Sequence, residues 1–437
     1  MIGVRSVKLR LLAGAACAAL TMLCAPAPAA TRPGYSTSAG MSVGQAVDMF
    51  YASRRGAPLW LRGGADSSAA RDLIGILDRA PIDGFANGPA IAAQAQGLMS
   101  RASIGDRAAL NAADRLLSTA WVLYVQALQR PPTGMIYADS WARPRPATPA
   151  QILARAAAAQ SLPAHLRSAA QVNPLYARLR AAGWAEKQST GRIDPRVLVS
   201  LDRVRERPFK KRYIIVDSAA ARLYMIEDGR IADSMRVIVG KASPGTQTPM
   251  LASTIYYATL NPYWHVAPEM IRTLTARNVL DQGLSYLTSR GYQVMPADGS
   301  DRLLDPAKID WHAVANGTET VRVRQLPGPA NSMGDIKFGF PNPYDIYLHD
   351  TPRKALFEQP DRDLSHGCIR LEDAERLGRW LLGRDPRTES KEPEQHELLP
   401  MPVPIYLTYL TAQVKDGQLS FVDDVYGRDA ERIAALR

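Results

Sequence analysis

The chain has 437 residues, of which 46% are hydrophobic and 22% are charged, with a formal net charge of +11. These values are ordinary for a globular protein and exclude wholesale disorder, and the length allows two or three domains of roughly 100–200 residues. The whole chain holds three cysteines, which excludes a disulfide scaffold and a multi-cysteine zinc ribbon.

The N-terminal segment has the three parts of a secretory signal peptide. Basic residues precede an apolar run over residues 11–23, and small residues follow up to Ala29. A run of about thirteen apolar residues is shorter than the ~20 that span a bilayer, so cleavage is favoured over a membrane anchor. We therefore expect residues 1–29 to be removed and the mature chain to be exported without a transmembrane segment. Cys17 and Cys24 leave with this segment, so Cys368 becomes the only thiol.

Residues 30–205 are predicted to form an all-α scaffold domain. The sequence from Gln45 to Leu201 is rich in Ala, Leu and Arg, and apolar residues recur at helical intervals, for example over residues 113–124. Breaks that contain Pro and Gly divide this region into about six to eight helices. The domain could dock or position other molecules, or it could simply support the second domain, which is the simpler interpretation.

Residues 206–437 are predicted to form a mostly β domain, because the apolar pattern changes to a period of two near Arg207. Two turn sequences, Glu-Asp-Gly-Arg at 227–230 and Lys-Asp-Gly at 415–417, are typical of β-hairpins. The strands predicted from this pattern cover residues 212–216, 223–227, 231–240, 254–260, 405–414 and 418–422.

Two segments of this second domain differ from the β pattern. Residues 264–320 contain a helix-like pattern at 268–278 and a polar stretch near 298–311, so we predict an insertion that caps a cleft. Residues 384–402 are charged and rich in proline, which predicts a surface loop.

The residues before Cys368 are typical of nucleophilic catalysis. A strand-like run over 344–348 ends at His349, and Ser365-His366-Gly367-Cys368 begins sixteen positions later. A thiol is mostly protonated at neutral pH, and a nearby imidazole can remove its proton so that the sulfur attacks an acyl carbon. His349 can approach Cys368 if the intervening residues fold back, whereas His366 could instead orient or polarise the reacting groups.

The neighbours of the thiol support the same chemistry. Gly367 lets the backbone pass close to a substrate, and N–H groups near Cys368 could hold a developing oxyanion. Arg370 offers a planar cation for a carboxylate. The spacing of the histidines and the cysteine does not match structural zinc, and a buried structural cysteine is the simpler alternative. Residue types alone favour a cysteine acyltransferase or hydrolase over a metal site.

This motif resembles the signature of the L,D-transpeptidases, which cross-link bacterial peptidoglycan and have a β-rich YkuD-type catalytic domain. The order of signal peptide, helical scaffold and catalytic domain with an inserted capping segment resembles the large YcbB-type members. The resemblance is strong over 206–437 and weaker over 45–205, and it implies an α+β chain. Further stretches that carry it are Arg-Val-Ile-Val-Gly-Lys at 236–241, Asn-Pro-Tyr-Trp at 261–264, Phe-Pro-Asn at 340–342 and Tyr-Leu-His-Asp-Thr at 347–351.

The resemblance implies attack by the cysteine on the third residue of a tetrapeptide stem, with release of the terminal D-Ala. The diaminopimelate amine of a second stem then resolves the thioester and gives a 3-3 cross-link. Water, a free D-amino acid or a lipoprotein lysine could replace that amine, and a catalytically silent wall-binding scaffold is a third possibility. The implied site consists of Cys368 as nucleophile, His349 as base, His366 and Gly367 beside them, and Arg370, Tyr347, Trp264 and Ser365 toward the substrate.

The resemblance also implies a periplasmic protein whose partners are peptidoglycan stem peptides and cell-wall synthesis proteins, with no nucleic acid. Carbapenems acylate the cysteine of this family, and the resemblance implies no cofactor and no metal. Such proteins usually carry a peptidoglycan-binding module, and the text between Leu179 and Arg207 is too short for one. Attachment to the wall is therefore open: the positive net charge could attract carboxylates of the wall, or it could be an ordinary solvated surface.

Overall fold

The computed structural model describes residues 41–208, 210–387 and 390–436. The predicted signal peptide, with Cys17 and Cys24, lies outside these residues. No helix in the described part of the chain combines the length and the apolar character that crossing a bilayer requires.

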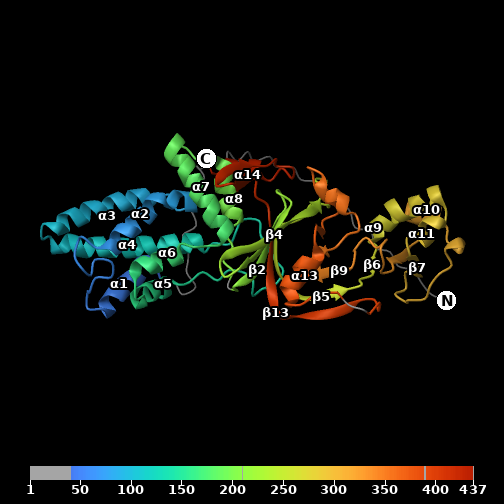
Figure 1. Cartoon of the computed structure of the whole chain (residues 1–437). Helices are drawn as coiled ribbons and strands as arrows, with labels where there is room; N and C mark the ends of the chain where they lie inside the picture. The colour runs from blue at the N-terminus through green and yellow to red at the C-terminus, as the bar shows by residue number, and fades with distance from the viewer. Residues whose placement is uncertain (1–40, 209, 388–389, 437) are drawn as a thin grey trace, which may run out of the picture. The chain divides into compact units, whose positions relative to one another are not determined.

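Eight α-helices form the described part of the predicted scaffold domain, which confirms the all-α prediction (Figure 1). One short strand, β1 (Ile136–Tyr137), departs from it, because it pairs in parallel with a strand of the second domain. The helices are α1 (Val43–Ser53), α2 (Ser68–Arg79), α3 (Gly88–Ser103), α4 (Arg107–Leu128), α5 (Pro149–Ala158), α6 (Leu162–Ala169), α7 (Pro174–Thr190) and α8 (Pro195–Arg203).

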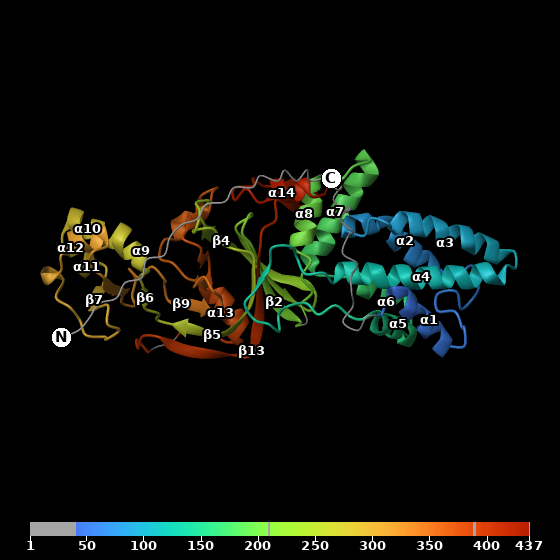
Figure 2. The same cartoon turned by 180° about the vertical axis from the view of Figure 1, so that it is seen from behind.

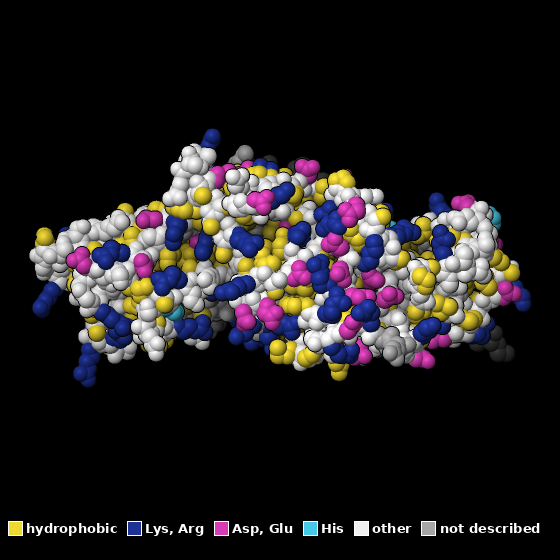
Figure 3. All heavy atoms as spheres, in the orientation of Figure 1, with side chains coloured by type: hydrophobic (Ala, Val, Ile, Leu, Met, Phe, Trp, Pro, Cys, Tyr) yellow, Lys and Arg dark blue, Asp and Glu magenta, His cyan; other side chains and the backbone are white. Residues whose placement is uncertain are grey.

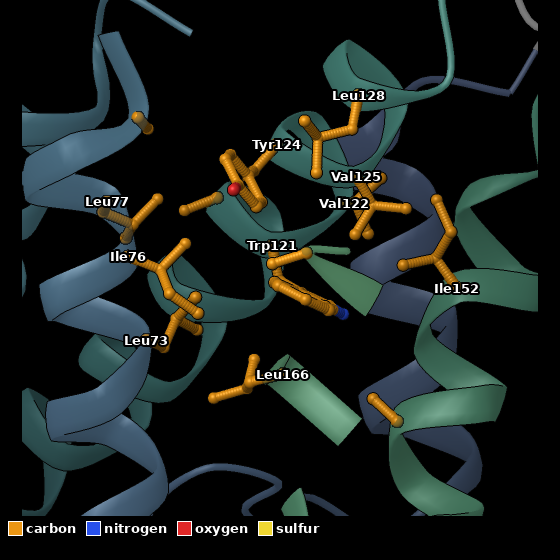
Figure 4. Close-up of a cluster of buried hydrophobic side chains, with 14 of the residues drawn as sticks. Leu73, Ile76, Leu77, Trp121, Val122, Tyr124, Val125, Leu128, Ile152 and Leu166 are labelled. Carbon is orange, nitrogen blue, oxygen red and sulfur yellow. The ribbon is translucent and has the colours of Figure 1, made fainter. Parts of the chain in front are cut away.

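The long helix α4 organises the core of this helical region. Its N-cap residue Asp106 accepts a hydrogen bond from the Ala109 backbone N–H (2.9 Å), which satisfies one of the free donors at the helix start. Figure 4 shows Trp121 of α4 between side chains of α2, α5 and α6, among them Leu73, Ile152 and Leu166. The three- and four-residue apolar spacing thus becomes the buried face of a helix.

The second domain is built on a sheet whose hydrogen bonding closes on itself. The strand order is β5-β13-β2-β3-β4-β12-β10-β9, and β9 pairs again with β5. β11 pairs with β4. Figure 2 shows β2, β4 and β13 of this sheet from behind. The strands are β2 (Arg212–Asp217), β3 (Arg222–Glu227), β4 (Arg230–Gly240), β5 (Leu251–Leu260), β9 (Ile336–Gly339), β10 (Tyr347–His349), β11 (Asp363–Ser365), β12 (Ile369–Leu371) and β13 (Gln395–Thr408).

Strand β2 shows how this ring is packed on both faces. Ile214 and Val216 belong to the apolar cluster inside the ring. Tyr213 and Ile215 point the other way and belong to the cluster that contains the helical core. A strand buried on both sides explains why this segment is almost continuously apolar instead of alternating with polar residues.

Both predicted hairpins are present. Asp228 and Gly229 have φ angles of 48° and 75°, and Asp416 and Gly417 have 51° and 81°. Two successive residues with positive φ are the mark of a type I′ turn, whose twist suits a two-residue hairpin. The first turn joins β3 to β4, and the second joins β14 (Ala412–Lys415) to β15 (Gln418–Phe421).

The prediction of a surface loop over residues 384–402 is wrong for its second half. Residues 395–402 belong to β13, which pairs with β5 on both sides of a register shift between Leu398 and Val403. Proline lacks a backbone N–H and normally disfavours a strand. Here the irregularity takes Pro400 and Pro402 out of the regular pairing, so the strand tolerates them.

Residues 264–325 form a unit with its own small sheet, ordered β6-β8-β7, and its own apolar cluster. The closing strand β8 lies beyond the predicted end of this segment at residue 320. The elements are β6 (Trp264–His265), α9 (Pro268–Met270), a π-helix at Ile271–Thr275, α10 (Ala276–Gln282), α11 (Ser285–Ser289), β7 (Tyr292–Pro296), α12 (Trp311–Asn316) and β8 (Val321–Gln325).

Helix α13 (Ala374–Leu382) follows the motif that contains Cys368, and α14 (Asp429–Ala434) lies near the C-terminus. The Gly383 N–H caps α13 by donating to Arg379 O, with φ of 71°, as its position in the sequence predicts. Figure 3 shows acidic and basic side chains interspersed over the face that carries α13. Arg376 of α13 pairs with Asp233 at 3.5 Å. Such exposed pairs contribute little stability, about 0–1 kcal/mol each.

Candidate active site

The pairing of β10 with β12 brings four of the predicted site residues to one face of the sheet. The two strands are parallel, with Leu348 opposite Ile369 and His349 opposite Arg370. Leu348 and Ile369 are fully buried inside the ring. Because side chains alternate along a strand, Tyr347, His349 and Arg370 lie on the opposite face, and Cys368 lies on that face just before β12 begins.

His349 is held in one tautomer and in the neutral state. Its Nδ1 lies 2.5 Å from the Asp350 backbone oxygen, and since a carbonyl can only accept, Nδ1 carries the proton. The side chain is 3% exposed. Burial, with the Arg370 charge as the next cause, lowers the pKa of His349 to about 3. Nε2 is therefore the basic nitrogen at neutral pH.

The Asp350 carboxylate does not orient this histidine. One carboxylate oxygen pairs with Lys354 Nζ at 2.6 Å, and the other accepts from the Asp335 N–H at 3.2 Å. The backbone carbonyl of Asp350 performs the orienting task instead.

Cys368 is a partly exposed free thiol whose sulfur lies 3.8 Å from the Asp345 backbone oxygen. Burial of the sulfur raises its pKa above the usual 9.0, and hydrogen bonds from the Tyr347 N–H and hydroxyl oppose that shift. The resting pair is therefore a protonated thiol and a neutral imidazole, not a thiolate–imidazolium ion pair.

Tyr347 connects the thiol to two neighbouring groups. Its ring meets the His349 ring edge to face at 5.7 Å between centroids. The Lys337 Nζ lies 4.2 Å from the Tyr347 ring centroid, and Lys337 is also the cross-strand partner of His349 on β9. Burial, and after it the nearby Cys368, raises the pKa of the Tyr347 hydroxyl, so the phenol stays protonated and can donate a hydrogen bond.

Arg370 is a half-buried cation on the same face. Burial, followed by the nearby Arg353, lowers its pKa, yet a guanidinium remains charged. Within the described ranges its side chain takes part in no hydrogen bond or ion pair, which leaves the guanidinium fork free for a carboxylate.

Ser365 and Gly367 shape the loop that carries the thiol. The Ser365 hydroxyl accepts from the Gly367 N–H (3.1 Å) and donates to the Cys368 backbone oxygen (2.6 Å). Gly367 has φ of 115°, a conformation that strongly favours glycine. Ser365 is only 2% exposed, so its hydroxyl serves the loop and does not face a substrate.

The remaining two predicted residues are His366 and Trp264. His366 is exposed, and its pKa is lowered by partial burial and then by the charge of Lys241. Trp264 is buried in the cluster of the 264–325 unit, where its ring lies 6.2 Å from that of Tyr292. Tyr347 packs against the same cluster, so Trp264 is linked to the site through that packing.

Two residues of this region were not predicted from the sequence. Lys337 faces His349 only because β9 pairs with β10, and Thr248 donates from its hydroxyl to the Gly367 oxygen at 2.8 Å. Neither residue stands in a recognisable motif, and only the strand pairing and the loop contact reveal them. Among the described residues, no three His, Cys, Asp or Glu side chains are arranged as a metal site would need.

Residues 211–403 match the family model of the L,D-transpeptidase catalytic domain (YkuD). The chain carries an L,D-transpeptidase catalytic domain. Residues 45–182 match the model of the scaffold domain, and the prediction of a helical scaffold followed by a mostly β catalytic domain is confirmed. His349 and Cys368 both lie inside the matched catalytic segment.

Comparison with individual proteins finds the following similarities. A Haemophilus influenzae protein described as "Putative L,D-transpeptidase" is 27% identical over 393 residues, which cover 87% of this chain and 77% of that protein. The L,D-transpeptidase from Mycobacterium smegmatis is 14% identical with a TM-score of 0.23, over 45% of this chain and 58% of that chain, less than two thirds of its length. The ertapenem-acylated catalytic domain from Enterococcus faecium is 14% identical with a TM-score of 0.22, over 46% of this chain and 98% of that domain.

Proposed function

We propose that this protein is a peptidoglycan L,D-transpeptidase that forms 3-3 cross-links through an acyl-enzyme on Cys368, with release of a terminal D-Ala. The observation that carries the proposal is the neutral, oriented His349 on the same sheet face as the protonated Cys368 thiol. A neutral, buried base on the same sheet face as a protonated thiol is suited to acyl transfer.

In the first step, Nε2 of His349 takes the thiol proton while the Cys368 sulfur attacks the carbonyl carbon of the third stem residue. The carbonyl electron pair moves to the oxygen, and backbone N–H groups of the loop stabilise that charge. When the pair returns, the bond to the D-Ala nitrogen breaks, and the imidazolium of His349 protonates the leaving amine. The product is a thioester on Cys368.

In the second step, the side-chain amine of a second stem attacks the thioester. His349 accepts a proton from the attacking amine, and the Cys368 thiol is restored as the sulfur leaves. The new amide joins two third-position residues. No metal or cofactor takes part in this scheme.

The stem peptide is proposed to bind through its carboxylates and its backbone. Arg370 is suited to a stem carboxylate, because its fork has no partner among the described side chains. Tyr347 offers an aromatic wall beside the sulfur, and Trp264 supports that wall through the cluster that both residues touch. His366 stands at the exposed rim, and we propose that the 264–325 unit caps the bound peptide.

An alternative is a hydrolytic or exchange enzyme with the same acyl-enzyme, in which water, a free D-amino acid or a lipoprotein lysine is the acceptor. The observation that keeps it in view is that Cys368 is partly exposed, so small acceptors have access to the thioester. In either case we propose a periplasmic enzyme, exported by its N-terminal segment, that works on the wall beside other cell-wall synthesis proteins.

Acylation tests the nucleophile. Mature protein is incubated with a carbapenem and weighed intact, in parallel with the Cys368→Ala variant. We expect one adduct on the wild type and none on the variant. An equal adduct on both, or none on the wild type while iodoacetamide still labels Cys368, would refute the proposed acyl-enzyme.

Muropeptide analysis decides the acceptor. The protein and its Cys368→Ala variant are expressed in a host that lacks such enzymes, and the wall is digested and separated. We expect new dimers joined between third-position residues with the active protein alone. Loss of tetrapeptides or of protein-linked species without such dimers would favour the hydrolytic or exchange alternative.

A further inference from the structure

Thr248 lies in the loop between β4 and β5 and takes no part in the scheme above. Its side chain is fully buried at 0% exposure. The hydroxyl accepts from the Gly240 N–H at 3.0 Å and donates to the Gly367 backbone oxygen at 2.8 Å. One hydroxyl thus ties the end of β4 to the residue before the nucleophile.

This bond sets the direction of the peptide group between Gly367 and Cys368. In a trans peptide the C=O and the N–H point in opposite directions. Because Thr248 holds the Gly367 oxygen toward the buried interior, the Cys368 N–H points away from Thr248. Within the described ranges this N–H has no acceptor, whereas the Gly367 N–H and the Cys368 oxygen are both occupied by Ser365.

Thr248 is itself held from behind by the C-terminal segment. The Tyr426 hydroxyl donates to the Gly240 oxygen (2.5 Å) and accepts from the Thr248 N–H (3.4 Å). Arg428 donates to the Thr248 backbone oxygen at 3.1 Å, and the Tyr426 ring stacks on Tyr409 at 5.0 Å. These aromatic and cationic supports lie after residue 403, outside the matched catalytic segment.

We propose that Thr248 is a positioning residue for the acyl-transfer step. It holds the Gly367–Cys368 peptide so that the Cys368 N–H donates to the oxygen of the carbonyl under attack, and Tyr426 holds Thr248 in place. This inference rests on the proposed function, because only an acyl substrate places a carbonyl oxygen there.

Acylation and alkylation of Cys368 together distinguish this positioning role of Thr248 from a general effect on the reactivity of the sulfur. In acylation, the C–S bond forms as the carbonyl pair moves to the oxygen, and that oxygen needs a donor until the pair returns. In alkylation by iodoacetamide, the C–S bond forms as the C–I bond breaks, and iodide carries the pair away. Both reactions use the Cys368 sulfur, but only acylation needs the Cys368 N–H.

The test compares both reactions in Thr248→Val, which keeps the side-chain shape and removes the hydroxyl. We expect carbapenem acylation to slow about 10–100-fold, in keeping with the cost of a displaced oxyanion donor, and alkylation to stay within about twofold of wild type. Thr248→Ser keeps the hydroxyl and is expected to restore acylation to within about threefold of wild type. Tyr426→Phe is expected to slow acylation by a smaller factor, again without slowing alkylation.

A matched control is Thr408→Val. Thr408 is also buried, and its hydroxyl also donates to a backbone oxygen, that of Arg203, at 3.0 Å. We expect this variant to leave both reactions unchanged.

Unchanged acylation in Thr248→Val, or an equal fall in acylation and alkylation, would overturn the inference while the acyl-enzyme stands. If Thr248→Val fails to fold, Tyr426→Phe decides: acylation as fast as in wild type would overturn the inference. A wild-type protein that is alkylated at Cys368 but never acylated would instead overturn the proposed function.

Discussion

Replacement of His349 by alanine is the sharpest test of how the thiol is activated. Burial raises the pKa of Cys368 above its ordinary 9.0, so at pH 7 the thiolate fraction is below about 1%. Without a base, acylation must proceed through that fraction. General-base catalysis is worth about 10²–10⁴-fold, and we therefore expect His349→Ala to slow carbapenem acylation at pH 7 by about 10²–10³-fold.

The pH profile of acylation gives a second, independent readout. The pKa of His349 is lowered to about 3, so the imidazole stays a base as the pH falls toward that value. Wild-type acylation should accordingly be almost flat between about pH 5 and 8. The His349→Ala variant depends on thiolate, so its rate should rise about tenfold per pH unit over the same range.

The assay follows adduct formation by intact mass at a series of pH values, with His396→Ala as the control, because His396 is an exposed histidine on β13. An acid limb in the wild type with a midpoint near the ordinary histidine value of 6.5 would refute the neutral, buried base. An unchanged rate in His349→Ala would transfer the role of base to His366.

Two further predictions concern stability. Burial raises the pKa of Glu206 from 4.5 to about 7. The contribution of Glu206 to stability is therefore complete below pH 4.5 and is lost as the pH rises through 7. Relative to Glu206→Gln, we expect the wild-type free energy of unfolding to fall by roughly 2–3 kcal/mol between pH 4.5 and 7. The Asp114 carboxylate accepts from the buried N–H groups of residues 59–61, so Asp114→Ala should cost roughly 3–5 kcal/mol, against about 1 kcal/mol for the cap removed by Asp106→Ala on the same helix.

Urea unfolding measures both effects. A difference between wild type and Glu206→Gln that does not change between pH 4.5 and 7 would contradict the raised pKa. Equal losses in Asp114→Ala and Asp106→Ala would show that the buried carboxylate is no more important than an ordinary helix cap.

The local sequence was sufficient to predict the hairpin turns and the end of helix α13. Asp-Gly pairs between apolar runs specify type I′ hairpins because both turn residues must adopt positive φ, and the structure has both turns. The glycine after α13 ends that helix for the same conformational reason. The motif from His349 to Cys368, together with further short stretches of the catalytic domain, carried the family resemblance, since nucleophile and base come from two short stretches of the chain.

The tertiary structure decided what depends on pairing between distant strands. The return of β9 to β5 closes the ring and places Lys337 opposite His349, and no periodicity in one strand reveals its partner. Likewise, Pro400 and Pro402 predicted a loop, but the pairing of β13 with β5 outweighed the low strand propensity of these prolines.

The charge state of the site and its loop geometry also came from the fold. The sequence showed a histidine and a thiol, but burial made the first a neutral base and kept the second protonated. The hydroxyl of Thr248 reaches Gly367 across 119 positions of the chain, a contact that only the folded loops create. What the sequence determined about this protein is the set of reacting groups and their local elements, and what the tertiary structure decided is how those groups are aimed and protonated, because both depend on long-range packing.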